Sequence, residues 1–434
     1  MKKNNNSARV LGALKNTLRA LRYKNYRLYF VGQAISLTGT WMQQVAMSWL
    51  VYRLTGSEFL LGVVSFSTTI PIFLLTPFTG VLADRYNRRN IIIATQITAM
   101  TQSLALAVLV LFGGVAVWHI IALGLLLGVA NAFEMPARQS FIIVMVEDKA
   151  DLSNAIALNS ALFNGARLIG PSIAGVLISI IGEGGCFLIN TVSFLAVIAA
   201  LLAMNITGGI VETNGASAAE RFREGFSYAF GHRPIRSILL LLALVSLMGM
   251  PFMVLMPVFA SEILHGGAGT LGFLMSSAGM GAFAAALYLA SRRSVMGLEK
   301  IISHSVFLFS ASIIVFAASR AFWLSVCMLF CAGFSMVTAM ASSNTYIQTV
   351  VDDDKRGRVM SFFTLSFMGM APFGSLLAGA LAHRIGSPMT IVISGIACAG
   401  GGVLFLKRRL ELAAALCERA SAVCPALEVD VEME

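Results

Sequence analysis

The chain has 434 residues, of which 57% are hydrophobic and only 12% carry a charge. A soluble globular domain carries about 25% charged residues, so the composition argues against an ordinary soluble protein. A membrane-spanning helix needs roughly 20 apolar residues, and the length therefore allows about a dozen spans joined by short loops. The net charge of +10 would suit a nucleic-acid-binding protein, but the placement of the basic residues argues for a different interpretation.

The chain begins with a polar, basic arm over residues 1–26 that does not resemble a secretory signal peptide. The first apolar stretch, about 27–52, therefore serves as its own insertion signal. Its polar residues fall on one arc of a helix, at about 100° per residue, and we expect this arc to line a cavity. Hydrogen bonding between helices uses the same residue types and is the alternative. The arc and the tryptophan that borders it comprise Gln33, Ser36, Thr40, Trp41, Gln43, Gln44 and Ser48.

A tight polar loop separates the second and third apolar stretches, about 59–83 and 90–112. It holds one acid among several arginines. A carboxylate at a helix end in a low-dielectric environment needs a cationic partner, which the arginines supply. The glycine before the acid lets another helix approach closely. The residues singled out here are Gly80, Asp84, Arg85, Arg88 and Arg89.

The fourth stretch, about 117–144, carries Asn131, Glu134 and Arg138. Proton coupling requires a carboxylate in a low-dielectric site near a cation, and Glu134 is the acid placed well within a predicted span. Our hypothesis is that Glu134 titrates and that Arg138 or Arg167 tunes it. A permanent ion pair between Glu134 and Arg138, four residues apart, is the structural alternative.

The fifth stretch, about 154–181, carries Arg167 near its midpoint, where an unpaired charge would cost several kcal/mol. Two roles are open for Arg167: a counter-charge for an anionic or catecholate substrate, or a packing contact to Asn164 and to helix-end carbonyls. Gly170, Pro171 and Gly175 predict a kink in the same span.

A polar linker over residues 205–235 follows the sixth stretch, about 186–204, and predicts an amphipathic surface helix over 216–230. The basic residues of the arm, the linker and the alternate loops lie on one side if the N-terminus is cytoplasmic, which is the positive-inside pattern. The last six spans are expected at about 236–259, 269–291, 299–318, 322–343, 357–382 and 387–406, before a C-terminal tail over 407–434.

No feature of the sequence predicts an enzyme. It contains no HExxH motif, no P-loop and no histidine cluster, and therefore no metal site or cofactor is expected. The six cysteines fall mostly in apolar stretches and behave as small hydrophobic residues. The predicted partners are the lipid bilayer and a small-molecule substrate, with no nucleic acid, and a monomer is expected.

The polar loop resembles the signature loop of the major facilitator superfamily, which joins the second and third spans. The matching residues are Gly80, Leu82, Ala83, Asp84, Arg85, Arg88 and Arg89. Asn87 replaces the usual glycine, and we expect it to substitute because asparagine tolerates a left-handed backbone. Three further stretches are similar to the enterobactin-exporter-like branch, whose members export drugs, macrolides or siderophores: Asn25 to Phe30, Met135 to Gln139 and Ala166 to Pro171.

This resemblance implies an all-α membrane protein of about twelve transmembrane helices in two pseudo-symmetric six-helix halves, 27–204 and 236–406. It implies an inner gate at the Asp84 loop and a multi-pass protein of the cell inner membrane with both termini cytoplasmic. The implied function is a proton-driven antiporter that exports a small amphipathic drug or siderophore by alternating access, with the proton gradient as energy source. Uptake of a small metabolite by the same fold is the alternative. The span-four arginine of many drug–proton antiporters is absent near Leu125, so their coupling scheme does not carry over.

Overall fold

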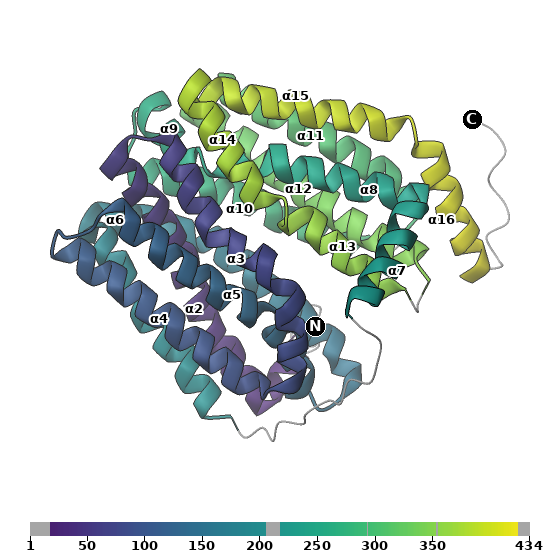
Figure 1. Cartoon of the computed structure of the whole chain (residues 1–434), viewed down its shortest axis with the longest axis horizontal. Coiled ribbons are helices and arrows are strands. Elements are labelled where there is room, and N and C mark those ends of the chain that lie inside the picture. The colour runs from purple at the N-terminus through teal and green to yellow at the C-terminus, as the bar shows by residue number, and fades with distance from the viewer. Residues whose placement is uncertain (1–17, 205–217, 293, 353–354, 424–434) are drawn as a thin grey trace, which may run out of the picture. The chain divides into compact units, whose positions relative to one another are not determined.

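The computed structural model describes residues 18–204, 218–292, 294–352 and 355–423 (Figure 1). Within these ranges every regular element is a helix, in agreement with the apolar runs of the sequence. The elements before the linker are η1 (Arg19–Arg22), α2 (Lys24–Thr55), α3 (Glu58–Arg85), α4 (Arg88–Leu111), α5 (Val117–Met145) and α6 (Lys149–Leu202).

The linker helix α7 (Ala218–Gly231) matches the amphipathic segment expected from the sequence. The remaining elements are α8 (Arg233–Leu244), η2 (Val245–Gly249), η3 (Met250–Met253), α9 (Met256–Val258), η4 (Phe259–Ile263), α10 (Ala268–Ser291), α11 (Leu298–Ala318), α12 (Phe322–Val350), α13 (Arg356–Met368), α14 (Ala371–Ile385), α15 (Ser387–Leu406) and α16 (Arg409–Val423).

Ten helical segments of the described chain are long and apolar enough to cross a membrane. The segment Ala150–Leu202 counts once among them, although its backbone departs from helical geometry at Gly182, where φ is 72° and ψ is 178°. This is the place where the sequence predicts an outer turn, and a glycine is required there because the positive φ is costly for residues with a Cβ atom. The first span, α2, is not among the ten, since its polar arc lowers its mean hydropathy.

The seventh span, expected at about 236–259, changes its helix type along its length. The segment Arg233–Ile263 passes from the α-helix α8 through π-helical and 3₁₀ turns before η4 ends it. Pro251 and Pro257 have no amide hydrogen to donate to the carbonyl oxygen four residues earlier, as an α-helix requires. The backbone hydrogen bonds near them therefore follow the three-residue and five-residue spacings of 3₁₀ and π helices. The expected span 357–382 lies within the segment Arg356–Ile385, which contains α13 and α14.

The described chain forms two compact units. Unit 1 contains residues 1–55, 67–213 and 267–276, and unit 2 contains 56–66, 214–266 and 277–434. Unit 2 thus includes residues 56–66 at the start of α3, and unit 1 includes residues 267–276 at the start of α10. The division of the chain at a central linker stays a prediction.

In unit 1 the start of α10 packs closely on α6. A Cβ atom at Gly272 would lie 2.5 Å from the carbonyl oxygen of Pro171, so no larger residue fits without movement. Beside it the Ser172 hydroxyl donates a hydrogen bond of 2.6 Å to Ser276.

Unit 2 contains a similar crossing between the start of α3 and α14. A Cβ atom at Gly62 would lie 2.6 Å from the carbonyl oxygen of Ser375 and 3.0 Å from the Cα of Gly379. The Ser65 hydroxyl donates to that of Ser375 over 3.0 Å. Small residues and paired hydroxyls are the usual way for apolar helices to approach closely in a membrane.

Candidate functional site

The two charged residues of α5 form an ion pair. Arg138 Nε lies 3.9 Å from Glu134 Oε1, one helical turn away, and their side chains are 16% and 15% exposed. The hydroxyl of Tyr29, from α2, is fully buried near this pair, and both charges act on it electrostatically. Among the predicted coupling contacts, it is the one for which the described residues give a distance.

Arg167 lies against an aromatic side chain of α2. Its guanidinium carbon is 5.7 Å from the ring centroid of Trp41, within the range of a cation–π interaction. The Trp41 ring meets the Phe163 ring edge to face, with centroids 5.8 Å apart. Gly170, one turn beyond Arg167 on α6, lets α2 come close, because a Cβ atom there would lie 2.6 Å from the Cβ of Trp41. We call Trp41, Phe163 and Arg167 the cation–aromatic cluster.

The amide of Gln43 belongs to a buried hydrogen-bond network that joins α2, α4 and α6. Gln43 Nε2 donates to Gln102 Oε1 over 2.8 Å, and Asn190 Nδ2 donates to Gln43 Oε1 over 2.6 Å. The Ser193 hydroxyl donates to Asn190 Oδ1 over 2.8 Å. Gly39 makes room for the network, since a Cβ atom there would lie 2.3 Å from Asn190 Oδ1. Sequence reasoning missed Gln102 and Asn190, although each is an isolated amide in an apolar run.

The other residues expected to line a cavity differ in their exposure. Gln33 is 2% exposed, whereas Gln44 is exposed. Thr40 and Asn164 are half-buried and donate to the carbonyl oxygens of the residues four before them in their own helices, at 2.9 and 2.8 Å. Asn131 is half-buried on α5. A cavity role for these residues stays a prediction.

The residues expected to kink the fifth span lie inside one continuous helical segment of α6. The only residue of α6 with non-helical backbone angles is Gly182, so neither Gly170 nor Pro171 interrupts the helix in its described backbone angles. Gly175 instead lies against α10, where a Cβ atom would be 3.1 Å from the Cα of Gly269.

The signature loop is described only in part. The backbone of Gly80, Asp84 and Arg85 belongs to α3, and their side chains lie outside the described residues. Arg89 Nη2 donates to the carbonyl oxygen of Leu202 over 2.9 Å, which ties the start of α4 to the end of α6. Arg88 is half-buried at the first position of α4.

Asn87 does not adopt the left-handed backbone that its substitution for glycine led us to expect. Its φ of −62° and ψ of 112° are extended, and its side chain caps α4 by accepting a hydrogen bond of 3.0 Å from the amide of Arg89. Asparagine is a favoured N-cap residue for this reason, so the departure from the family pattern has a structural role.

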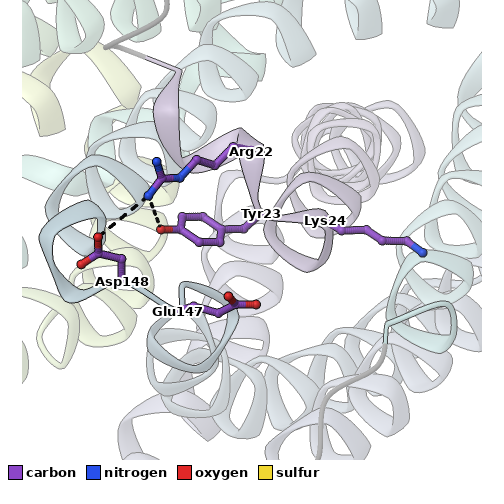
Figure 2. A pocket seen from close by; sticks show the side chains of 5 residues that line it. All are labelled: Arg22, Tyr23, Lys24, Glu147 and Asp148. Carbon is purple, nitrogen blue, oxygen red and sulfur yellow. Dashed lines mark hydrogen bonds and ion pairs between the residues drawn. The ribbon is translucent and has the colours of Figure 1, made fainter.

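The N-terminal segment is clamped to the start of α6 within unit 1. Asp151, 4% exposed, pairs with Arg19 at 2.9 Å and with Arg22 at 2.8 Å, and accepts a hydrogen bond of 3.0 Å from the Tyr23 hydroxyl. Arg22 also donates to the Tyr23 oxygen over 2.7 Å (Figure 2), and this hydrogen bond raises the pKa of its guanidinium. Asp148 lies 3.9 Å from Arg22, and both residues line an open pocket of about 1000 Å³. We call Arg19, Arg22, Tyr23 and Asp151 the N-terminal clamp.

A second clamp joins the linker helix α7 to the start of α13 within unit 2. The Tyr228 hydroxyl donates to Asp352 Oδ2 over 3.1 Å, and Arg358 Nη1 donates to Glu224 Oε2 over 2.6 Å. The ammonium of Lys355 lies 4.6 Å from the centre of the Tyr228 ring. The pocket beside this clamp has a volume of about 640 Å³ and is lined by Glu224, Tyr228, Lys355 and Arg358. We call Glu224, Tyr228, Asp352 and Arg358 the linker clamp.

An ion pair that the sequence analysis did not predict joins the end of α2 to the turn in α6. Arg53 reaches both oxygens of Glu183, at 2.7 and 3.2 Å, and Glu183 is 6% exposed. Such a two-point contact fixes the geometry more tightly than a single hydrogen bond does. The sequence offers one signal for this pair: Arg53 and Glu183 have opposite charges, and each lies at the predicted outer end of a span.

The chain is similar to known transporters along most of its length. The model of the protein family described as "transmembrane secretion effector" matches residues 15–434. The staphyloferrin A transporter of Staphylococcus aureus is 27% identical over 390 residues, which cover 89% of this chain and 97% of that protein. Macrolide efflux protein A of Streptococcus pyogenes is 22% identical over 86% of this chain and 94% of its own length. The multidrug efflux pump Tap of Mycolicibacterium fortuitum is 25% identical over 85% and 92%.

Solved structures of two transporters share the fold. A bacterial homologue of the human lysosomal transporter Spinster superposes with a TM-score of 0.66 at 14% identity, covering 91% of this chain and 98% of that one. A POT family transporter in complex with 5-aminolevulinic acid gives a TM-score of 0.73 at 9% identity, covering 89% and 96%. At these identities the likeness concerns the fold alone.

Proposed function

Because this chain belongs to the transmembrane secretion effector family of the major facilitator superfamily, we propose that it is a proton-coupled exporter of a small amphipathic compound. Its family and its relatives are transporters rather than enzymes. Efflux is the named activity of the macrolide and multidrug relatives, and a siderophore is named for the staphyloferrin A transporter. These names support a drug or a siderophore as the exported compound.

We propose that the chain crosses the membrane twelve times in two six-helix halves. Ten segments qualify as spans by length and hydropathy; α2 would add one, and the backbone turn at Gly182 would divide α6 into two. The even number of spans and the positive-inside pattern favour cytoplasmic termini and insertion in the inner membrane. The protein is proposed to act as a monomer without a cofactor.

The cation–aromatic cluster is the observation that most supports an amphipathic substrate. A guanidinium beside the Trp41 ring, which in turn meets the Phe163 ring, offers a charged contact next to an apolar one. Ligands with an acidic group and a flat apolar body match both contacts, because aromatic faces stack with planar groups while the cation attracts the acid. We propose Arg167 as the counter-charge of such a substrate.

We propose Glu134 as the proton-coupling acid. It is mostly buried, and a cation is within reach, since Arg138 Nε lies 3.9 Å from its Oε1. Substrate binding or a helix movement that separates the pair would favour protonation of the acid.

Transport in proteoliposomes tests this proposal. A pH gradient is imposed, and the movement of a macrolide, of staphyloferrin A and of a lipophilic cationic dye is followed with and without a protonophore. We expect protonophore-sensitive movement of at least one compound, and Glu134→Gln should abolish gradient-driven transport while substrate binding is retained. Glu147→Gln, the same change at an exposed acid in the connection before α6, is the control. Unchanged gradient-driven transport in Glu134→Gln would remove the coupling role, and accumulation in the opposite direction would favour metabolite uptake, the alternative function.

The signature loop is proposed to act as an inner-gate latch, with Asp84 as its acid and Arg85, Arg88 and Arg89 as nearby cations. A latch changes the rate of the conformational cycle rather than the affinity for substrate. Asp84→Asn should therefore lower the turnover rate about tenfold, a barrier change of roughly 1.4 kcal/mol, with little change in KM. A raised KM at an unchanged turnover rate would contradict this role.

A further inference from the structure

The two parts of α6 on either side of Gly182 both pack against one short stretch of α2. The first part approaches at Gly170, where a Cβ atom would lie 2.6 Å from the Cβ of Trp41. The second part approaches opposite Gly39, where a Cβ atom would lie 2.5 Å from the hydroxyl oxygen of Ser193. Both crossings are so close that a rotation of α2 within unit 1 would disturb both.

Trp41 and Gln43 point to opposite sides of α2. Successive residues of an α-helix are about 100° apart around its axis, so two positions in sequence differ by roughly 200°. Trp41 accordingly lies beside Arg167 and Phe163 in the first part of α6. Gln43 instead accepts a hydrogen bond of 2.6 Å from Asn190 in the second part. The side chain that binds one part of α6 is therefore linked rigidly to the side chain that meets the other.

The contacts on the Gln43 side are directional. The Ser193 hydroxyl donates to Asn190, Asn190 donates to Gln43, and Gln43 donates to Gln102, over 2.8, 2.6 and 2.8 Å. All four side chains are buried, and we call them the amide network. A hydrogen bond weakens steeply when its angle is distorted, and apolar helices in a membrane have few other contacts that depend on rotation. The amide network therefore specifies one rotational setting of α2.

Gln43 is the member that joins the helices. Its amide is bonded to Gln102 on α4 and to Asn190 on α6 at once. The Nε2 of Gln102 is buried and makes no hydrogen bond to any residue that the structure describes, so its contact with Gln43 runs through its oxygen. Loss of the Gln43 amide would remove a partner from buried groups on two other helices, and such groups are costly to leave unpaired.

We infer that the amide network sets the rotation of α2 that brings Trp41 to Arg167, and that Gln43 is thereby a positioning residue for the cation–aromatic cluster. The inference rests on the proposed function, in which that cluster holds an amphipathic acid. Gln43 is itself buried, so it acts on the substrate through Trp41 and not by contact. This role differs from the cavity lining that the polar arc of the first span suggests.

The fluorescence of Trp41 tests the inference without a substrate. The full-length protein is purified in lipid nanodiscs with Trp41 as its sole tryptophan, and its emission maximum and its quenching by acrylamide are measured. Gln43→Leu should change both, because Trp41 leaves its place beside Arg167. Unchanged emission and quenching in folded Gln43→Leu protein would overturn the inference, since a merely structural role would lower stability alone. The other tryptophans are replaced by Trp49→Phe, Trp118→Phe and Trp323→Phe.

A matched pair of variants on α4 keeps this test valid if Gln43→Leu does not fold. Gln102→Leu removes a member of the amide network on a different helix, and it should change the emission of Trp41 through Gln43 alone. Gln96→Leu is the same change at another buried glutamine of α4, outside the network, and should leave the emission unchanged. Equal emission in these two variants would contradict the inference.

Binding of 2-naphthoate, an acid with a flat apolar body, separates this inference from the proposed function. Equilibrium dialysis should show that Gln43→Leu weakens binding about tenfold but has no further effect in a Trp41→Ala background. Equal weakening in both backgrounds would show that Gln43 does not act through Trp41. If the wild type does not bind 2-naphthoate, the proposed substrate class fails, and the emission of Trp41 still decides whether the amide network positions it.

Discussion

In the N-terminal clamp the accepting side chain, Asp151, is 6% exposed, whereas its counterpart in the linker clamp, Asp352, is 37% exposed. Each carboxylate accepts a hydrogen bond from a tyrosine, Asp151 from Tyr23 and Asp352 from Tyr228. A cation also lies over each tyrosine ring: Arg22 is 4.9 Å from the centre of the Tyr23 ring, and Lys355 is 4.6 Å from that of Tyr228. The same contacts therefore occur once in a buried setting and once in an exposed setting.

The difference indicates what each clamp contributes. A buried carboxylate with two arginines and a hydroxyl around it stabilises the structure, because loss of its charge leaves several donors without an acceptor. An exposed pair such as Arg358 with Glu224, whose side chains are 36% and 59% exposed, contributes about 0 to 1 kcal/mol and is screened by salt. We therefore expect the N-terminal segment to be held firmly and α7 to detach more readily.

The largest expected effect is that of removing the buried charge. Asp151→Asn should lower the free energy of unfolding by about 2 kcal/mol, a value reduced from the sum of its contacts because both arginines are partly exposed. The matched change Asp352→Asn should cost less than about 1 kcal/mol. Thermal unfolding of both variants in one detergent measures the difference, and equal losses would remove the distinction between the clamps.

A smaller effect is expected from the tyrosine hydroxyls. Tyr23→Phe removes a donor to a buried carboxylate and should cost about 1 kcal/mol, whereas Tyr228→Phe should cost about half as much because water can replace the lost hydroxyl. Limited proteolysis of the two variants is a second measure, since a detached segment is cut faster. Faster cleavage in Tyr228→Phe than in Tyr23→Phe would reverse the assignment.

The smallest effect is expected at the surface pair of the linker clamp. Glu224→Gln should lower stability by about 0.5 kcal/mol at low ionic strength and by almost nothing in 0.5 M salt, where the screening length falls to roughly 4 Å. Unfolding temperatures of the variant and the wild type at both salt concentrations provide the measurement. A loss that persists at high salt would show that Glu224 has a packing role.

The helices could be predicted closely from the sequence, because an apolar run of fixed length has few alternatives in a membrane. The predicted stretch 117–144 corresponds to α5 (Val117–Met145), and the expected linker helix 216–230 to α7 (Ala218–Gly231). The changes of helix type within the seventh span were not predicted. Its prolines were visible, but a proline kinks some membrane helices and interrupts others according to the neighbours that satisfy the freed carbonyls.

The candidate site was predictable only as a set of residue types. Periodicity places most polar residues of the first span on one arc, yet it cannot tell an amide that faces an open space from one that faces another amide. Gln43 meets Gln102 and Asn190, which are 59 and 147 residues away in the chain. The pair Glu134–Arg138 was foreseen because its spacing is local.

By itself, the sequence determined that this is a helical, multi-span membrane protein and which residues carry charge inside its spans. Hydropathy, helical period and basic-residue placement are local properties, and each can be read without knowing which helices are neighbours. Only the tertiary structure decided that Arg167 lies over Trp41, that Asp151 is enclosed by two arginines, and that Gln43 meets Gln102 and Asn190. These outcomes depend on which helix faces pack together, and many arrangements of apolar helices satisfy the same hydropathy pattern.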